Sequence, residues 1–419
     1  MKRLLTFVAT VGLAAAQSTP KYRIVDLGTL PGGDFSQATW LNDLGLATGL
    51  AADKDGTQQA MFWLGMFRMN IGTPGLNSGA FFVNNLGQAV VQAEVASKDP
   101  NNENFCAYNT GRLCLPYLWD RGRLVPLPLL GGNNGTVGSV NSRGQTVGIA
   151  ETALHDPNCP PGISPAGTGP QVLDFQGVVW GPQAGQVRAL RPLGGDTVSM
   201  AIGINDSGQV VGASGTCANT VLPPLAYGAH SVLWDADGTA HDLGNLGSTA
   251  VNMALGINNR GQVVGISSLH PDSSVESGSH AFLWTKQSGV MRDLGTLPGD
   301  VQSVAQAIND AGQITGVSFD DHGNPRPFLW QNGVMRDLNE LVVGGAPLYL
   351  LFGPSINAFG AIAGFGVTEN GDVHAFLALP AIGKLADASF REPVPMPQNL
   401  QQVMGTAGGS FRIGMPHRR

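Results

Sequence analysis

The feature that most constrains the fold of this chain is a short element that recurs seven times along it. The element is an apolar residue followed by Asn, two variable residues and Gly, and we call it the Asn turn. Successive copies lie 42 to 64 residues apart, an internal period that is typical of propeller blades. The sequence therefore predicts one repetitive architecture. The repeated Asn residues are Asn42, Asn84, Asn141, Asn205, Asn258, Asn309 and Asn357.

Each repeat contains four strand-like runs, which are clearest in the sixth repeat at residues 303–308, 313–319, 326–330 and 334–338. The Asn turn joins the first run to the second. Asn at the first position of a type I turn can bond its own backbone, and Gly supplies the positive φ that restarts a strand. A large ring ends most third runs and would fill the gap between stacked sheets. These rings are Trp63, Trp119, Trp180, Trp234, Trp284 and Trp330.

The two ends of the repeat region complement each other. Residues 22–28 resemble the fourth run of other repeats, whereas the seventh repeat stops after its third run at residues 374–379. Pairing these two segments would close a ring and remove exposed sheet edges. We therefore predict an all-β fold, a seven-bladed β-propeller of four-stranded antiparallel blades whose last blade is closed by the N-terminal strand. Residues 383–387 are an alternative source of that strand, and an open β-solenoid is the competing architecture.

The N-terminal residues predict export. Lys2 and Arg3 precede an apolar stretch and three Ala residues that offer a signal-peptide cleavage site, and the stretch is short for a membrane anchor. The expected organisation is a signal peptide over residues 1–16, the propeller over 17–380 and a flexible C-terminal tail over 381–419.

Composition limits the partners and the class of fold. Gly makes up 59 of 419 residues and 42% of residues are apolar, which suits many short strands and tight turns around a core. Without the two basic residues of the signal, 21 basic residues face 30 acidic ones, a net charge of −9. This balance argues against nucleic acid and against anionic membranes.

Several segments resemble the bacterial extracellular repeat called HAF, named after a His-Ala-Phe triplet in its third strand. The triplet stands at residues 280–282 and 374–376, with degenerate forms at 59–62 and 326–328. The companion motif Asp-Leu-Gly-Thr-Leu-Pro-Gly stands at residues 26–32 and 293–299, with looser copies at 190–195 and 242–247. The resemblance covers nearly all of residues 22–380, and repeats two and three depart most from it. It implies an extracellular protein and assigns no catalytic residues.

Three long insertions point to a binding surface. They fall between the second and third runs at residues 96–115, 151–176 and 215–228. Such loops lie on the same face of a propeller as the connections between blades, and long loops on a rigid scaffold often carry function. We call this the insertion face. The residues expected to bind a ligand there are Asp34, Asp196, Asp300, His155, Asp156, Tyr108 and Tyr227.

All four cysteines lie in these insertions. In an exported chain an even number of cysteines suggests disulfides, and we favour Cys106–Cys114 as a local bridge and Cys159–Cys217 between neighbouring blades. The alternatives are other pairings or free thiols. A metal site is not predicted, because neither a CxxC spacing nor a His pair accompanies the cysteines.

Two acidic patterns allow a chemical and a structural interpretation. Asp34, Asp196 and Asp300 are each followed by a Ser within three residues; they could be carboxylates of a glycoside-cleaving site, but their repetition favours turn chemistry. Residues 53–57 and 235–239 resemble the start of a calcium loop but lack its later ligands, and Asp-Gly is also a common hairpin turn.

The sequence thus favours a secreted binding or interaction module that engages an unknown extracellular glycan or protein through the insertion face of blades 2–4. The alternative is an extracellular carbohydrate-active hydrolase or lyase on a propeller scaffold, and a third reading is a structural envelope protein. No Ser-His-Asp constellation or phosphate-binding loop is visible, so we predict no catalytic residues, no metal and no cofactor, and we expect a monomer without membrane insertion after signal cleavage.

Overall fold

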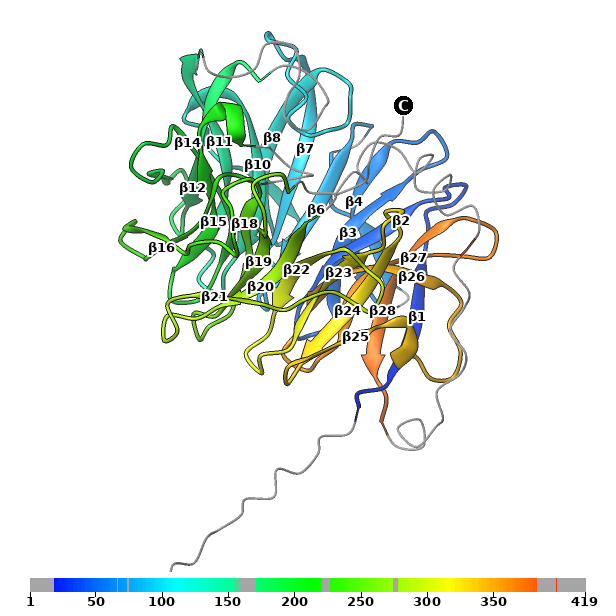
Figure 1. Cartoon of the computed structure of the whole chain (residues 1–419). Coiled ribbons are helices and arrows are strands. Elements are labelled where there is room, and N and C mark those ends of the chain that lie inside the picture. The colour runs from blue at the N-terminus through cyan, green and yellow to red at the C-terminus, as the bar shows by residue number, and fades with distance from the viewer. Residues whose placement is uncertain are drawn as a thin grey trace, which may run out of the picture.

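The fold is a closed ring of seven four-stranded antiparallel sheets, as the repeat predicts. The structure is a computed structural model that describes residues 19–65, 67–73, 75–155, 157, 171–220, 227–273, 278–382 and 397. The first strand of each blade lies against the first strand of the next blade, so these seven strands surround the central axis (Figure 1).

The strands of each blade are given from the innermost to the outermost. Blade 1 contains β2 (Ser36–Leu41), β3 (Leu46–Ala52), β4 (Gln58–Leu64) and β5 (Phe67–Asn70). Blade 2 contains β6 (Ser78–Val83), β7 (Ala89–Lys98), β8 (Arg112–Asp120) and β9 (Arg123–Pro126). Blade 3 contains β10 (Gly131–Val140), β11 (Thr146–His155), β12 (Leu173–Trp180) and β13 (Val187–Leu190). Blade 4 contains β14 (Val198–Ile204), β15 (Val210–Gly215), β16 (His230–Trp234) and β17 (Ala240–Asp242). Blade 5 contains β18 (Asn252–Ile257), β19 (Val263–Ser268), β20 (Ser279–Trp284) and β21 (Met291–Asp293). Blade 6 contains β22 (Gln302–Ile308), β23 (Ile314–Phe319), β24 (Pro325–Gln331) and β25 (Val334–Asp337). Blade 7 contains β26 (Tyr349–Ile356), β27 (Ile362–Val367), β28 (Val373–Pro380) and β1 (Tyr22–Gly28).

The N-terminal strand closes the last blade, as predicted. β1 pairs antiparallel with β28, from Tyr22 opposite Pro380 to Asp26 opposite Phe376. In Figure 1 the dark blue β1 lies beside the orange strands of blade 7. The alternative strand at residues 383–387 and the expected tail from residue 383 onward lie outside the described residues, apart from residue 397.

Helical structure in the described ranges is limited to two short 3-10 turns, η1 (Cys217–Asn219) and η2 (Asn339–Leu341). No helix there is long and apolar enough to span a bilayer.

The Asn turns interlock around the whole ring. Each Asn accepts two backbone N–H groups of its own turn through Oδ1; for Asn42 these are the N–H groups of Leu44 and Leu46, at 3.0 and 2.9 Å. Its Nδ2 donates to the backbone carbonyl of the corresponding Asn in the next blade, at 2.9–3.2 Å in all seven blades. The last of these bonds runs from Asn357 to Asn42 and closes the circle. The Gly that ends each turn has a φ between +72° and +83°, which a residue with a Cβ rarely adopts.

Three serines that follow the inter-blade acids tie neighbouring blades together at the other end of the first strands. Ser36 Oγ accepts the N–H of Ala375 at 2.9 Å and donates to the Gly28 carbonyl at 2.7 Å, so it bridges the third and fourth strands of the preceding blade. Ser199 and Ser303 make the same pair of bonds to blades 3 and 5. This supports the structural interpretation of the repeated Asp-Ser pattern.

A His–Asp pair joins the third and fourth strands near the insertion face. In the closing blade, His374 Nδ1 lies 2.9 Å from Asp26 Oδ2, so the pair connects the two ends of the propeller. The bond to Asp26 raises the pKa of His374. Burial alone acts to raise the pKa of Asp26, but hydrogen bonds from His374 and Gly28 hold it below its ordinary value. The corresponding pairs are His230–Asp242 in blade 4, His280–Asp293 in blade 5 and the neutral Gln59–Asn70 in blade 1.

A first prediction separates the inter-blade bond from the turn itself. Asn205→Asp keeps the oxygen that accepts the N–H groups of Ser207 and Gln209, but it replaces the donor to the Asn258 carbonyl with a carboxylate oxygen. Because that carbonyl is then left buried beside an acceptor, we expect a loss of about 1–3 kcal/mol in the free energy of unfolding. Thermal and urea unfolding measure it, with Asp206→Asn in the same turn as the control. Equal midpoints for Asn205→Asp and the native chain would show that the ring adds nothing beyond the turns.

A second prediction concerns the closing pair. The raised pKa of His374 makes its contribution to stability complete below pH 6.5 and lost as the pH rises through the folded value. The lowered pKa of Asp26 makes its contribution complete above pH 3.8 and lost as the pH falls through the folded value. The double variant His374→Gln/Asp26→Asn copies the neutral pair of blade 1. As the pH rises from 5.5 to 8.5, the melting temperature of this variant should therefore fall less than that of the native chain.

The same exchange at His280 and Asp293 in blade 5 is the control, because that pair does not join the chain ends. A melting temperature that depends on pH identically in the native chain and in the closing-pair variant would contradict the prediction.

Candidate functional site

One position of each innermost strand interrupts the ladder and lines a central cavity. In five of the seven first strands the register slips at the residue three positions before the Asn, where a β-bulge leaves that residue without a partner in the ladder. In β10 and β26 the slip covers the same position and one neighbour. The residues at this position keep some exposure, and all of them line one central cavity. We call them the axial residues: Thr39, Phe81, Gly138, Ile202, Leu255, Gln306 and Pro354.

The cavity has a volume of about 350 Å³, which is within the range of small-molecule sites, roughly 300–1,000 Å³. Its wall is mainly apolar. Trp40 and Phe82, from blades 1 and 2, stack with ring centroids 3.9 Å apart on one side. None of the described residues that line it carries a charged side chain.

The cavity opens toward the face that carries the Asn turns. Wall residues at the far end, such as Gln37, Leu50 and Gln302, are buried, whereas Trp40, Phe82 and Ile257, close to the Asn turns, are partly exposed. The lining residues Ile204 and Ile308, which directly precede an Asn, are buried, so the opening lies beside Trp40, Phe82 and Ile257.

The insertion of blade 2 closes the opposite end. Phe105, Cys106, Ala107 and Tyr108 contribute to the cavity lining, and the first three are at most 5% exposed. Phe105 and Cys106 join an apolar cluster with residues of all the other blades, among them Met200, Met253 and Phe352. We call residues 99–111 the plug loop.

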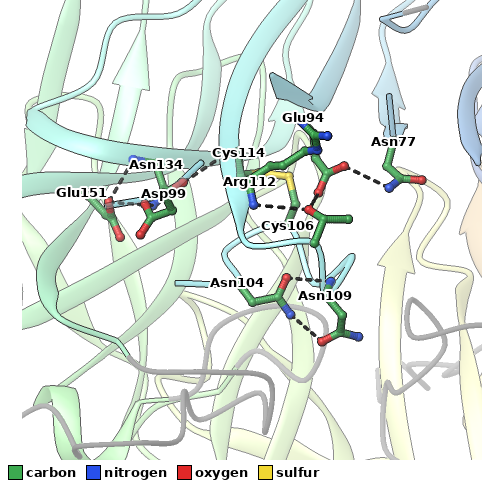
Figure 2. Close-up of a disulfide and its surroundings, with 11 residues drawn as sticks. Asn77, Glu94, Asp99, Asn104, Cys106, Asn109, Arg112, Cys114, Asn134 and Glu151 are labelled. Carbon is green, nitrogen blue, oxygen red and sulfur yellow. Dashed lines mark hydrogen bonds between the residues drawn. A yellow bond between two sulfur atoms is a disulfide. The ribbon is translucent and has the colours of Figure 1, made fainter. Parts of the chain in front are cut away.

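The plug loop is held in a strained conformation by many bonds (Figure 2). Asn102, Ala107 and Asn109 have φ values of +56°, +60° and +59°, which are uncommon for residues other than Gly. The Cys106–Cys114 disulfide, confirmed by the structure, fixes the loop to β8, with 5.4 Å between the Cα atoms. Asn104 and Asn109 bond each other twice at 2.9 Å across its tip. Asn tolerates this region of φ, so the strain falls mainly on Ala107, beside the disulfide.

Buried carboxyl groups anchor the plug loop to blade 3. Glu103 accepts the N–H groups of Val172 and Leu173 at 2.6 and 3.0 Å. Glu151 Oε2 accepts the N–H groups of Asn133 and Asn134 at 3.1 and 2.8 Å.

The two carboxyl groups share one donor, because Gln171 Nε2 lies 3.2 Å from an oxygen of each. Figure 2 shows Glu151 and Asp99 on either side of Asn134, whose amide donates to both. Burial raises the pKa of Glu151 to about 8, and the charge of Glu103 adds to the rise. Burial also raises the pKa of Glu103.

The polar side chains of the cavity wall include those of Gln37, Thr39, Gln92, Tyr108, Ser139, Gln302 and Gln306. Thr39 Oγ1 donates to the Ala80 carbonyl at 2.7 Å, and Ser139 Oγ accepts the N–H of Ile204 at 3.0 Å. Gln306 is different: its buried Oε1 has no hydrogen-bond partner among the described residues. A buried amide oxygen left in this way costs about 1–3 kcal/mol. Because this atom is closed to water, a ligand in the cavity reaches it only after a half-turn of the amide, and the hydroxyl of Tyr108, also in the lining, is buried without a partner in the same way.

The ligand-binding residues expected from sequence lie in different places. Tyr108 lines the cavity, and Tyr227 packs against the same apolar cluster as Tyr108. His155 is exposed at the end of β11, and Asp156 lies outside the described residues.

The three repeated acids do not line the cavity. Asp34 is exposed. Asp196 Oδ2 accepts the Ser214 hydroxyl at 2.6 Å, and Asp300 Oδ1 lies 2.5 Å from Arg326. Whether any of them binds a ligand at the insertion face stays a prediction.

The remaining cysteine and calcium predictions have separate outcomes. Cys217 is buried, while Cys159, its expected partner, lies outside the described residues. The two calcium-like segments are hairpin turns, in which the backbone N–H and carbonyl groups of Asp53 and Asp235 form hydrogen bonds within the same turn. Neither residue belongs to a described cluster of potential metal ligands.

Comparison with known proteins identifies the fold only. No family model matches the chain, and comparison with curated proteins gives no match. The acylaminoacyl peptidase of Pyrococcus horikoshii aligns over 86% of this chain with 10% identity and a TM-score of 0.51; the aligned part is 54% of that protein, so this chain spans about half its length.

Two further solved structures are more distant. The propeller domain of the trilobed protease from Pyrococcus furiosus aligns over 86% of this chain and 98% of that one, with 10% identity and a TM-score of 0.48. The BP39L lectin from Burkholderia pseudomallei aligns over 90% and 98%, with 10% identity and a TM-score of 0.38. The chain is a seven-bladed β-propeller, and these similarities do not assign its activity.

The axial residues were missed by sequence reasoning, although a signal for them exists. They stand three residues before the Asn of every repeat, and the seven residues at that position are all different. Positions that hold the blades together repeat their residue type, whereas this one does not.

A third prediction follows from the buried carboxyl groups. Between pH 4.5 and about 8 the folded chain keeps a proton on Glu151 that the unfolded chain releases, so stability falls as the pH rises through this window. One proton gives a slope of up to about 1.4 kcal/mol per pH unit. Glu151→Gln stays neutral and should flatten the fall, as measured by unfolding midpoints from pH 5 to pH 9. Glu369→Gln, at an exposed position, is the control, and parallel curves for the native chain and Glu151→Gln would contradict the prediction.

Proposed function

We propose that this protein is an exported binding module that holds a small, largely apolar ligand in its central cavity. The observation that carries the proposal is the cavity itself: a one-ended space of about 350 Å³ with apolar walls, closed by the plug loop and open beside the Asn turns. Such a space with few polar groups is the usual form of a small-molecule site.

Export and membership of the HAF-repeat family are part of this proposal. The Cys106–Cys114 disulfide suits an oxidising compartment. The two HAF submotifs also meet in space, because His280 and His374, the first residues of the triplets, bond the Asp residues that begin the companion motifs. Their pairing gives a physical reason for the two motifs to occur together.

The hydrolase alternative finds less support at the axis. Glycoside cleavage needs a pair of accessible carboxyl groups, and the described lining has none. Glu103 and Glu151 do form a carboxyl pair, but both are fully buried and engaged in anchoring the plug loop. The geometry therefore favours binding over hydrolysis.

The fourth prediction tests the cavity with 2-naphthol as the probe, because its two fused rings match an apolar space of this size. Isothermal titration calorimetry should show saturable binding to the native chain with one site. Leu255→Trp fills the cavity from an axial position and should weaken binding at least tenfold. Leu86→Trp, the same exchange at a 69% exposed position in an Asn turn, should leave the affinity unchanged. Binding that ignores Leu255→Trp, or no saturable binding at all, would reject the central cavity as the site.

A further inference from the structure

Within the cavity, the axial residues are arranged unevenly. Around the ring Gln306 stands between Leu255 and Pro354, while blades 2 and 3, across the axis, contribute Phe81 and Gly138. Among the axial residues there is thus one amide on one side and an aromatic ring on the other, while the amides of Gln37, Gln92 and Gln302 lie elsewhere in the lining.

Gly138 keeps its side of the cavity free of a side chain for a steric reason. A Cβ at this position would lie 2.4 Å from the carbonyl oxygen of Ile202 in the next blade, closer than atoms can approach without movement. The neighbouring strand therefore requires Gly here, and this part of the lining is backbone alone.

The polar content of the cavity defines what kind of ligand can enter. A charged group would lose its hydration without a compensating partner, because no described lining residue is charged. A purely apolar ligand would leave the Gln306 amide unbonded inside the complex. A ligand with an uncharged hydroxyl or amide group meets both conditions. The Gln306 amide can present its oxygen or, after a half-turn, its NH₂ group, so a group that both donates and accepts fits either orientation.

We infer that the cavity selects an uncharged amphipathic small molecule whose apolar body lies against Phe81, Trp40 and Leu255 and whose hydroxyl or amide group bonds Gln306. This inference rests on the proposed function and adds the chemical class of the ligand. It makes Gln306 a specificity-determining residue among the axial residues, since the hydroxyl group of Thr39, the other polar axial residue, is already engaged within the protein.

The fifth prediction compares three probes that share one apolar body: naphthalene, 2-naphthol and 2-naphthoate. We expect 2-naphthol to bind the native chain about three- to tenfold more tightly than naphthalene, the range of one net hydrogen bond. We expect 2-naphthoate to bind most weakly. Dissociation constants from ligand-observed NMR titration of the full chain give the comparison.

Gln306→Leu should abolish the preference of 2-naphthol over naphthalene while keeping the binding of naphthalene. Gln183→Leu, the same exchange at an exposed position of blade 3, should keep the preference. Circular dichroism and melting temperature check that both variants fold.

The possible outcomes separate the two proposals. If none of the three probes binds, the proposed function fails. If they bind with equal affinity, if 2-naphthoate binds most tightly, or if Gln306→Leu leaves the preference intact, the inference about the ligand class is overturned while the cavity remains a binding site.

Discussion

The structure depends on one hydrogen bond that is repeated around the ring, from the side-chain amide of an Asn to the backbone of the same turn in the next blade. Each Asn acts twice, because its oxygen holds its own turn and its nitrogen holds the neighbour. The circle is completed only when Asn357 reaches Asn42, 315 residues away in sequence. Local turn chemistry thus becomes a global constraint that sets how closely the seven blades approach at one end of the axis.

That constraint explains where the cavity lies. With the Asn turns fixed, the bulge that precedes each of them by three residues places one residue of each first strand in the cavity wall. The bulge needs no particular side chain, so the axial position is free to vary while Asn and Gly recur. Within this chain the residues of the scaffold are therefore recognised because their type repeats from blade to blade. The axial residues of the candidate site are recognised because their type does not.

Much of the fold was predictable because it rests on local rules. The Asn turns, the Trp at the end of the third strands and the complementary terminal segments predicted the blades, their number and the closing strand, and all of these are confirmed. The site was less predictable. A bulge shifts the alternation of a strand by one residue and leaves no fixed residue type behind, so the inward direction of Phe81 or Gln306 could not be read from periodicity.

The insertions illustrate the same limit. Their length indicated loops on one face, and the short spacing of Cys106 and Cys114 indicated a local bridge, which is correct. Nothing in the spacing showed that Phe105 and Tyr108 turn into the axis and become part of the core. That direction depends on long-range contacts, in particular the bonds of Glu103 to residues 172 and 173, which lie about 70 positions away.

The plug loop also determines how strongly a polar group in the cavity acts. A propeller channel open at both ends would be filled by solvent. An amide in its wall would then exchange a water partner for a ligand group, with little net gain in free energy. Because Phe105 and its neighbours close the insertion end, the wall loses much of its access to water and the dielectric around Gln306 falls. A single hydrogen bond then discriminates more strongly between ligands than it would at a surface. The positive φ of Ala107 and the burial of Glu103 and Glu151 accompany this arrangement, since the plug loop that they belong to or anchor maintains the closed end on which the proposed selectivity depends.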